Sequence, residues 1–338
     1  MAFLRWKRGG SWVLALVGTG LLAYLGSRVS WQGLGTSLGD ASWRWLSAAM
    51  LISMVSVSLR ALRLSLLLGE LTTFLQTWRA VCLGYFTSLF LPLGGGEIVK
   101  IAALSRLSSI SLPRASTALA IDRGFDLAAL SALLIGVVGA GLLQGVRAWP
   151  IVGLALLSAV LIALLLFILV SGEALRQRLA AWARRRPGRQ PWIRRFDEIH
   201  DQAGALRRPG LLPAIGLLQG AIFTVDILSA WCILLAFPFG QGLPISAPLR
   251  LAFFVMLGFG LPLLPGGFGS HQAATILAMA PFGIGLTKAL ALSLAGEAAH
   301  VVTLGVLGLA AILGSGLNPL RLTTSPEVLD SPHPPEAP

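Results

Sequence analysis

The chain has 338 residues, of which 55% are hydrophobic and 12% are charged, and its mean hydropathy is +0.80. Soluble domains carry about 25% charged residues, so this composition excludes a soluble protein and indicates an integral membrane protein. The formal net charge of +12 does not favour nucleic-acid binding, because the basic residues cluster at the ends of apolar segments, as they do in cytoplasmic loops.

The N-terminal part of the chain predicts two membrane spans. The first covers residues 11–29 and follows a basic N-terminus. We interpret it as a retained span with a cytoplasmic N-terminus, since no small-x-small cleavage site follows it. The second covers about 43–68 and ends near Arg60 and Arg63, which lie three positions apart and share one helix face. The sequence leaves open whether these arginines reach the inner headgroups or face a site.

A break in the apolar pattern follows, within residues 79–110. The apolar pieces on either side are shorter than the roughly 20 residues that a span needs. Glycine breaks leave backbone groups unpaired, which is tolerable at membrane depth only beside protein or a wet cavity. We therefore predict a re-entrant hairpin over 79–110 that enters and leaves on the cytoplasmic side. Its tip contains Gly94, Gly95 and Gly96, followed by Glu97 and Lys100.

The next span is predicted over 115–143 and begins with a charge cluster. Asp122 and Asp126 are four positions apart and share one face, while Arg123 is expected on a different face. The cluster is either an ordinary helix-start group or a polar site near the inner mouth. A fourth span, 150–170, returns the chain to the cytoplasm.

Residues 171–210 contain ten arginines and four acidic residues. This composition predicts a cytoplasmic linker that lies along anionic lipid headgroups, with each arginine near the surface adding up to about 1 kcal/mol. Binding of RNA is the less favoured alternative.

The remaining apolar segments repeat the earlier pattern. A fifth span, 211–236, contains Asp226, and a second hairpin over 249–281 enters from outside. The sixth span covers about 287–314, with Glu297 and His300 one turn apart. The break in the second hairpin contains Gly266, Gly267 and Gly269 and is followed by Ser270, His271 and Gln272.

The fold class predicted is therefore all-α. The chain is a polytopic membrane protein with about six full spans and two re-entrant broken-helix hairpins, arranged as an inverted repeat. Residues 1–170 form the first membrane half and 171–210 the basic linker. Residues 211–316 complete a second half that begins near 150, and a tail rich in proline, serine and threonine, 317–338, is expected to be disordered in the cytoplasm.

Two breaks in corresponding halves of a transporter-like chain indicate a binding site. The candidate substrate-binding residues are those of the two breaks and the ionisable residues at membrane depth: Gly94, Gly95, Gly96, Glu97, Lys100, Arg60, Arg63, Asp122, Arg123, Asp126, Asp226, Gly266, Gly267, Gly269, Ser270, His271, Gln272, Glu297 and His300.

Glu97 illustrates the chemistry expected at the first break. An ionised carboxylate at membrane depth needs a partner, and Lys100 or the arginines of neighbouring helices could supply one. The amides of the helix that starts after Gly96 also favour an anion, either Glu97 itself or a lipid phosphate. The alternative is that these ion pairs only fix the positions of helices.

The order and spacing of these motifs resemble the lysylphosphatidylglycerol synthase transmembrane region, also called the flippase-like domain family, from the first span to about residue 314. The matching residues are Pro92, Gly96, Glu97 and Lys100, then Asp122, Arg123 and Asp126, and then the break Pro265–Gly269. The resemblance implies a polytopic inner-membrane protein that handles lipids, with translocation between leaflets the favoured role. This chain departs from the family at Gln272, where a glutamate is usual.

The function expected is that of a lipid transporter in the bacterial cytoplasmic membrane, with both termini cytoplasmic. It would move or present a phosphate-headed, sugar-headed or hopanoid-type lipid between leaflets. One alternative is an intramembrane lipid-modifying enzyme that uses Glu97, Asp226, Glu297 or His300 as acid or base. Another is a non-catalytic partner of a lipid-synthesis enzyme. The expected partners are membrane lipids, and neither a cofactor nor nucleic acid is expected. A metal is not expected either, because His271 and His300 lack a metal-binding spacing.

Overall fold

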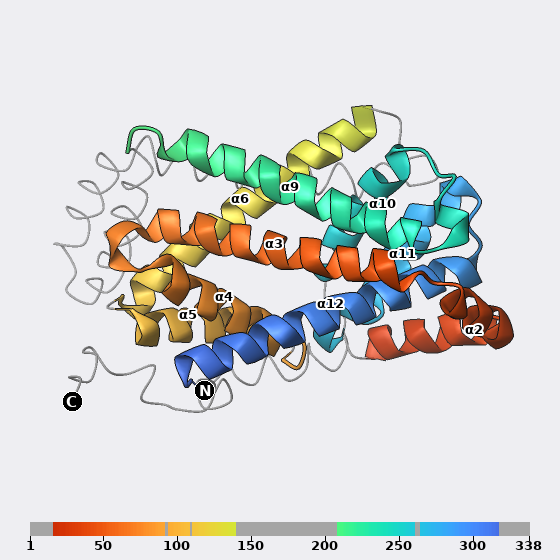
Figure 1. The fold of residues 1–338 in the computed structure, drawn as a ribbon, viewed down its shortest axis with the longest axis horizontal. Helices are drawn as coiled ribbons and strands as arrows, with labels where there is room; N and C mark the ends of the chain where they lie inside the picture. The colour runs from red at the N-terminus through yellow and green to blue at the C-terminus, as the bar shows by residue number, and fades with distance from the viewer. Residues whose placement is uncertain (1–15, 92–93, 109, 140–207, 261–263, 318–338) are drawn as a thin grey trace, which may run out of the picture.

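The computed structural model describes residues 16–91, 94–108, 110–139, 208–260 and 264–317, and the regular structure within these ranges is helical (Figure 1). This confirms an all-α fold. The predicted fourth span, 150–170, nearly all of the basic linker and nearly all of the tail lie outside the described residues, so these assignments stay predictions.

Three of the described helices are long and apolar enough to cross a membrane. They are α3 (Trp43–Leu68, extended by one 3₁₀ turn to Leu71), α9 (Leu211–Leu235) and α12 (Leu286–Ser315). These helices coincide with the second, fifth and sixth predicted spans. The first span is described only as helical residues 16–28. The count of six spans therefore stays a prediction.

Helix α6 (Leu112–Gly139) occupies the position of the predicted third span. It has 28 residues, enough for about 42 Å at 1.5 Å per residue. Of its four charged residues, Arg114 lies in the first turn, whereas Asp122, Arg123 and Asp126 lie near the middle of the helix rather than at its start. Because of them, α6 is not among the helices whose composition alone indicates a span.

A short helix, α2 (Trp31–Gly39), lies in the connection before α3. Its N-cap is Ser30, whose side-chain oxygen accepts a hydrogen bond from the Gly33 amide at 3.2 Å. A cap of this kind satisfies one of the backbone donors that every helix start leaves free. The helix packs against α12 and so belongs to the body of the protein.

The first predicted hairpin is a pair of short helices that pack against each other, α4 (Phe74–Ser88) and α5 (Gly95–Leu107). Gly94, at φ 82°, turns the chain into α5, a conformation that glycine adopts without a Cβ penalty. Helix α4 begins earlier than predicted because Thr73 and Gln76 form a capping box. The broken-helix interpretation of this segment agrees with the structure, whereas its re-entrant path through a membrane stays a prediction.

The second predicted hairpin has the same construction, with α10 (Ser246–Gly260) packed against α11 (Ser270–Met279). The chain between them includes the 3₁₀ turn η4 (Pro265–Gly267). Three glycines of this break have positive φ angles, Gly266 at 73°, Gly267 at 85° and Gly269 at 84°.

The two hairpins lie at opposite ends of the long helices (Figure 1). One hydrophobic cluster joins α10 and α11 to the start of α12, and a second joins α4 and α5 to α3 and the end of α12. Helices α3 and α9 pack along each other between the two ends. This arrangement brings both breaks toward the middle of the molecule and is compatible with an inverted repeat, which stays a prediction.

Candidate functional site

A cavity of about 810 Å³ lies between the two hairpins. Both breaks line it, the first with Gly94 and Gly96 and the second with Gly266 and Gly267. Side chains of α3, α6, α9 and α12 complete the wall. Each glycine break therefore has a cavity beside it, the environment in which unpaired backbone is tolerated at membrane depth.

The predicted site residues divide into two groups around this cavity. Those that line it are Arg60, Gly94, Gly96, Glu97, Arg123, Asp126, Asp226, Gly266, Gly267, His271 and His300. The others, which do not line it, are Arg63, Gly95, Lys100, Asp122, Gly269, Ser270, Gln272 and Glu297.

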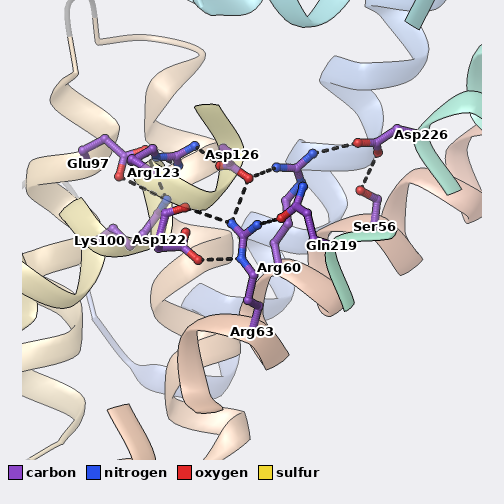
Figure 2. Close-up of polar contacts among 10 residues, drawn as sticks. All are labelled: Ser56, Arg60, Arg63, Glu97, Lys100, Asp122, Arg123, Asp126, Gln219 and Asp226. Carbon is purple, nitrogen blue, oxygen red and sulfur yellow. Dashed lines mark hydrogen bonds and ion pairs between the residues drawn. The ribbon is translucent and has the colours of Figure 1, made fainter. Parts of the chain in front are cut away.

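Arg60 joins the two halves of the chain through ion pairs (Figure 2). One terminal nitrogen lies 3.3 Å from Asp126 on α6, and the other lies 2.7 Å from Asp226 on α9. The second oxygen of Asp226 accepts a hydrogen bond from Ser56 at 2.6 Å. Arg60 therefore lines the cavity with both of its terminal nitrogens paired to carboxylates.

Arg63 lies one turn further along α3 and its side chain is completely buried. Its Nε donates to Asp122 at 2.8 Å, and a terminal nitrogen donates to Asp126 at 2.8 Å. The other terminal nitrogen donates to the side-chain oxygen of Gln219 on α9. Gln219 is not among the site residues predicted from the sequence, although a polar residue in an apolar helix two turns before Asp226 is a usable signal.

Glu97 receives two cations at the tip of the first hairpin (Figure 2). Lys100 Nζ, one of the partners expected from the spacing, lies 3.2 Å from both of its carboxylate oxygens. Arg123 lies 2.5 Å from Glu97 and also pairs with Asp126 at 2.9 Å. Arg123 was expected on a different helix face from Asp122 and Asp126, and its long side chain nevertheless reaches the Asp126 carboxylate three residues further along α6.

These residues form one ion-pair network with balanced charge. It contains the cations Arg60, Arg63, Lys100 and Arg123, and the carboxylates Glu97, Asp122, Asp126 and Asp226. Every member has at least one partner of opposite sign, which is the condition for keeping charges at membrane depth. The network links α3, α5, α6 and α9, so it both stabilises the helix arrangement and forms the charged wall of the cavity.

A second polar cluster lies where α11 meets α12. The side-chain oxygen of Gln272 accepts a hydrogen bond from the Gly269 amide at 2.5 Å, and its amide nitrogen donates to Glu297. Ser270 donates to the Gly267 carbonyl at 3.0 Å. The side chains that follow the second break therefore bond to the break itself and to α12.

Two histidines belong to this second cluster. His271 Nδ1 lies 2.8 Å from the Ser293 hydroxyl and 3.9 Å from Glu297. The ring of Phe259 contacts both histidines, with centroid distances of 5.0 Å to His271 and 4.7 Å to His300. Within the described ranges, His, Cys, Asp and Glu side chains form no group of three that could hold a metal ion.

The family model for the lysylphosphatidylglycerol synthase TM region matches residues 11–308. The chain belongs to this family. A comparison with curated proteins gave no match. Membership in the lysylphosphatidylglycerol synthase TM region family, together with the three apolar helices, identifies a membrane protein and indicates a role connected with membrane lipids.

The region matched to the lysylphosphatidylglycerol synthase TM region family contains every candidate site residue, from Arg60 to His300. It also contains the departure at Gln272, where we expected a glutamate in members of the family. The structure brings the carboxylate of Glu297 against the Gln272 side chain. A carboxylate of α12 therefore lies beside the Gln272 side chain.

Proposed function

We propose that the protein moves a lipid with a phosphate- or sugar-bearing headgroup between the leaflets of the bacterial cytoplasmic membrane. The observation that carries the proposal is the cavity: it has one charged wall, is otherwise mostly apolar, and is bounded by two broken hairpins from opposite ends of the molecule. An amphipathic ligand fits such a cavity better than a wholly polar or wholly apolar one does.

Arg123 is the cation best placed to receive the headgroup. Its side chain is 36% exposed and lines the cavity, whereas Arg63 and Lys100 are buried behind the wall. A guanidinium presents a planar fork of donors that matches a phosphate group. A phosphate on Arg123 would compete with Glu97, whose side chain is 37% exposed.

The carboxylates on the same wall suit a sugar headgroup. Glu97, Asp126 and Asp226 line the cavity and can accept hydrogen bonds from hydroxyl groups. Apolar side chains on the remaining wall provide a surface for an acyl chain, and they include Leu127, Leu130, Val255, Met256, Leu292 and Leu304.

The hairpins supply a physical means of opening the cavity to either leaflet. In transporters with two broken-helix repeats, movement of one repeat against the other exposes a central site alternately to each side. Here each break lies at the cavity, and each hairpin packs at a different end of the long helices.

The test uses purified protein in liposomes that contain fluorescently labelled phosphatidylglycerol. We expect the labelled lipid to exchange between leaflets faster than in protein-free vesicles. Arg123→Gln should slow this exchange by about tenfold or more, because a charge-assisted hydrogen bond contributes ~1.5–3 kcal/mol. The matched control is Arg106→Gln, which removes an exposed arginine from α5 and should leave the rate unchanged.

Two outcomes would contradict the proposal. One is an absence of acceleration across a panel of phosphate- and sugar-headed lipids, with folding verified by gel filtration. The other is the appearance of a chemically altered lipid in mass spectra, which would favour an intramembrane enzyme over a transporter.

A further inference from the structure

We propose that Glu297 is a proton-binding site that couples proton movement to lipid transport. This inference rests on the function proposed above and identifies the source of energy for it. Four features of the second polar cluster support it: the burial of Glu297, a free carboxylate oxygen, the scarcity of neighbouring cations, and a hydrogen-bonded link through Gln272 to the second glycine break.

The first two features concern Glu297 itself. The residue is 2% exposed and lies well inside the apolar helix α12. Its Oε1 has no hydrogen-bond partner among the described residues, and its Oε2 accepts a hydrogen bond from Gln272. An unpaired charge at such a position is costly, so ionisable residues inside membrane helices are commonly parts of ion or proton pathways.

The third feature separates Glu297 from the carboxylates of the ion-pair network. Each of those has a lysine or arginine within 4.0 Å, whereas the nearest chargeable group that contacts Glu297 within the described ranges is His271, 3.9 Å away. A single free oxygen can bind a proton, whereas a metal ion requires several converging ligands. The proton is therefore the cation that fits.

The charged groups on the elements packed against α12 do not replace this missing partner. On α12 itself, His300 lies one turn after Glu297, and the positive charge of Arg60 on α3 acts on the His300 ring. Helix α2 carries no titratable residue. The arginines of α3 and α4 have other surroundings: Arg60 and Arg63 pair with the aspartates of the ion-pair network, Arg79 lies against Gly314, and Arg44 is exposed. Tyr85 lies against Lys100, and Lys288 lies against Phe239. The thiols of Cys82 on α4 and Cys232 on α9 are buried and supply no cation.

The fourth feature connects Glu297 to the second hairpin. Gln272 donates one hydrogen bond to the carboxylate and accepts another from the Gly269 amide in the break. Protonation of Glu297 removes the negative charge of the carboxylate. The hydrogen bond from Gln272 then changes from charge-assisted to neutral and becomes about half as strong. Release of the proton restores the bond. His271 lines the cavity and contacts Glu297, so the proton has a route from the cavity.

The experiment follows labelled phosphatidylglycerol in liposomes under an imposed pH gradient, an imposed Na⁺ gradient, or neither. We expect the exchange rate of the wild-type protein to change with the direction of the pH gradient, by up to about tenfold for a gradient of about one pH unit. Glu297→Gln should lose this dependence on the pH gradient, and Glu297→Asp should retain part of it. The matched control is Asp40→Asn, which changes an exposed carboxylate and should keep the full response.

A second measurement protects the test against a Glu297→Gln variant that does not fold. A pH-sensitive dye inside wild-type vesicles should report proton movement when labelled lipid is added to one side. Lipid exchange that ignores the pH gradient, or responds to Na⁺ instead, would overturn the inference and leave the proposed function standing. No lipid exchange under any gradient would overturn both.

Discussion

Glu97 and Lys100 form the ion pair at the hairpin tip, and the two side chains differ strongly in burial. The Lys100 side chain is 2% exposed and that of Glu97 is 37% exposed. Lys100 also lies over the ring of Tyr85, with Nζ 4.6 Å from its centroid. Removal of the Glu97 charge therefore leaves a buried ammonium with an aromatic face but no carboxylate.

We predict that Glu97→Gln lowers both stability and transport. Breaking a fully buried ion pair costs about 3–5 kcal/mol, and the partial exposure of Glu97 reduces the expected loss to about 1–3 kcal/mol. Thermal unfolding in detergent measures the stability, and the liposome exchange rate measures transport. Glu70→Gln, at an exposed position before α4, is the matched control and should change neither quantity.

The double variant Glu97→Gln/Lys100→Met separates the two effects. It removes both charges, so the free energy of unfolding should recover, whereas transport should stay low if Glu97 contacts the headgroup. A Glu97→Gln protein with wild-type stability and activity would refute this account and mean that the carboxylate faces water.

The residue-level predictions from sequence succeeded where partners are close in the chain. The spacing of three between Glu97 and Lys100 made Lys100 one of the partners expected for Glu97, and the two side chains form an ion pair. The partner of Arg60 on α9 is 166 positions away, and no local rule selects Asp226 from the carboxylates available. Gln219 was missed because an uncharged amide in an apolar helix attracts no electrostatic argument until Arg63 is placed beside it.

The first hairpin depends on a close approach between its two helices at Gly84 and Gly96. A Cβ added to Gly96 would collide with the Gly84 carbonyl oxygen and lie 2.9 Å from the Ser88 Cβ. A Cβ on Gly84 would lie 2.9 Å from the Gly96 carbonyl oxygen. Small residues at helix contacts allow this kind of packing between membrane helices.

We predict that Gly96→Ala destabilises the protein by about 1–3 kcal/mol, because the added methyl group overpacks the hairpin. Thermal unfolding in detergent measures the change. The matched control is Gly216→Ala in α9, where an added Cβ meets nothing within 4 Å. That variant should be neutral or stabilising by up to about 1 kcal/mol, since alanine favours a helix interior. Equal stability of both variants would mean that the hairpin helices are further apart than described.

The elements were predictable from sequence in proportion to their length. The bounds of α3, α9 and α12 agree with the predicted spans to within one residue, because long apolar runs between polar segments mark them clearly. Helix α2 was missed, since a nine-residue amphipathic segment has no such run and is held by packing against α12. The start of α4 was predicted too late in the chain, because the capping box of Thr73 and Gln76 begins the helix before the apolar run does.

The positions of the hairpins at opposite ends of the whole molecule lead to a prediction about membrane topology (Figure 1). Single cysteines are introduced after replacement of the buried Cys82 and Cys232, and an impermeant reagent is applied from either side. Glu70→Cys and Arg114→Cys flank the first hairpin and should react from the cytoplasmic side only. Gly242→Cys, before α10, should react from the outer side only.

Reaction of the two flanking cysteines from opposite sides would contradict the re-entrant path of the first hairpin. Reaction of all three cysteines from one side would contradict the opposite orientation of the halves. The sequence could predict this topology only through basic residues in loops, and most of those lie between 171 and 210, a range that is described only from residue 208 onward. The proposed inverted repeat therefore depends on the labelling result.

The ion pairs of Arg60 also have a consequence for the biosynthesis of the protein. The ribosome adds about 5–20 residues per second. Asp126 lies 66 positions after Arg60 and is therefore synthesised roughly 3–13 seconds after it. Asp226 lies 166 positions after Arg60 and follows it by roughly 8–33 seconds. Until Asp226 emerges, the network holds four cations and only three carboxylates. The nascent first half thus carries one unbalanced positive charge within the translocation machinery, and insertion of α9 neutralises it. The ion-pair network is therefore complete only when both halves are present, because neither half contains a balanced set of charges.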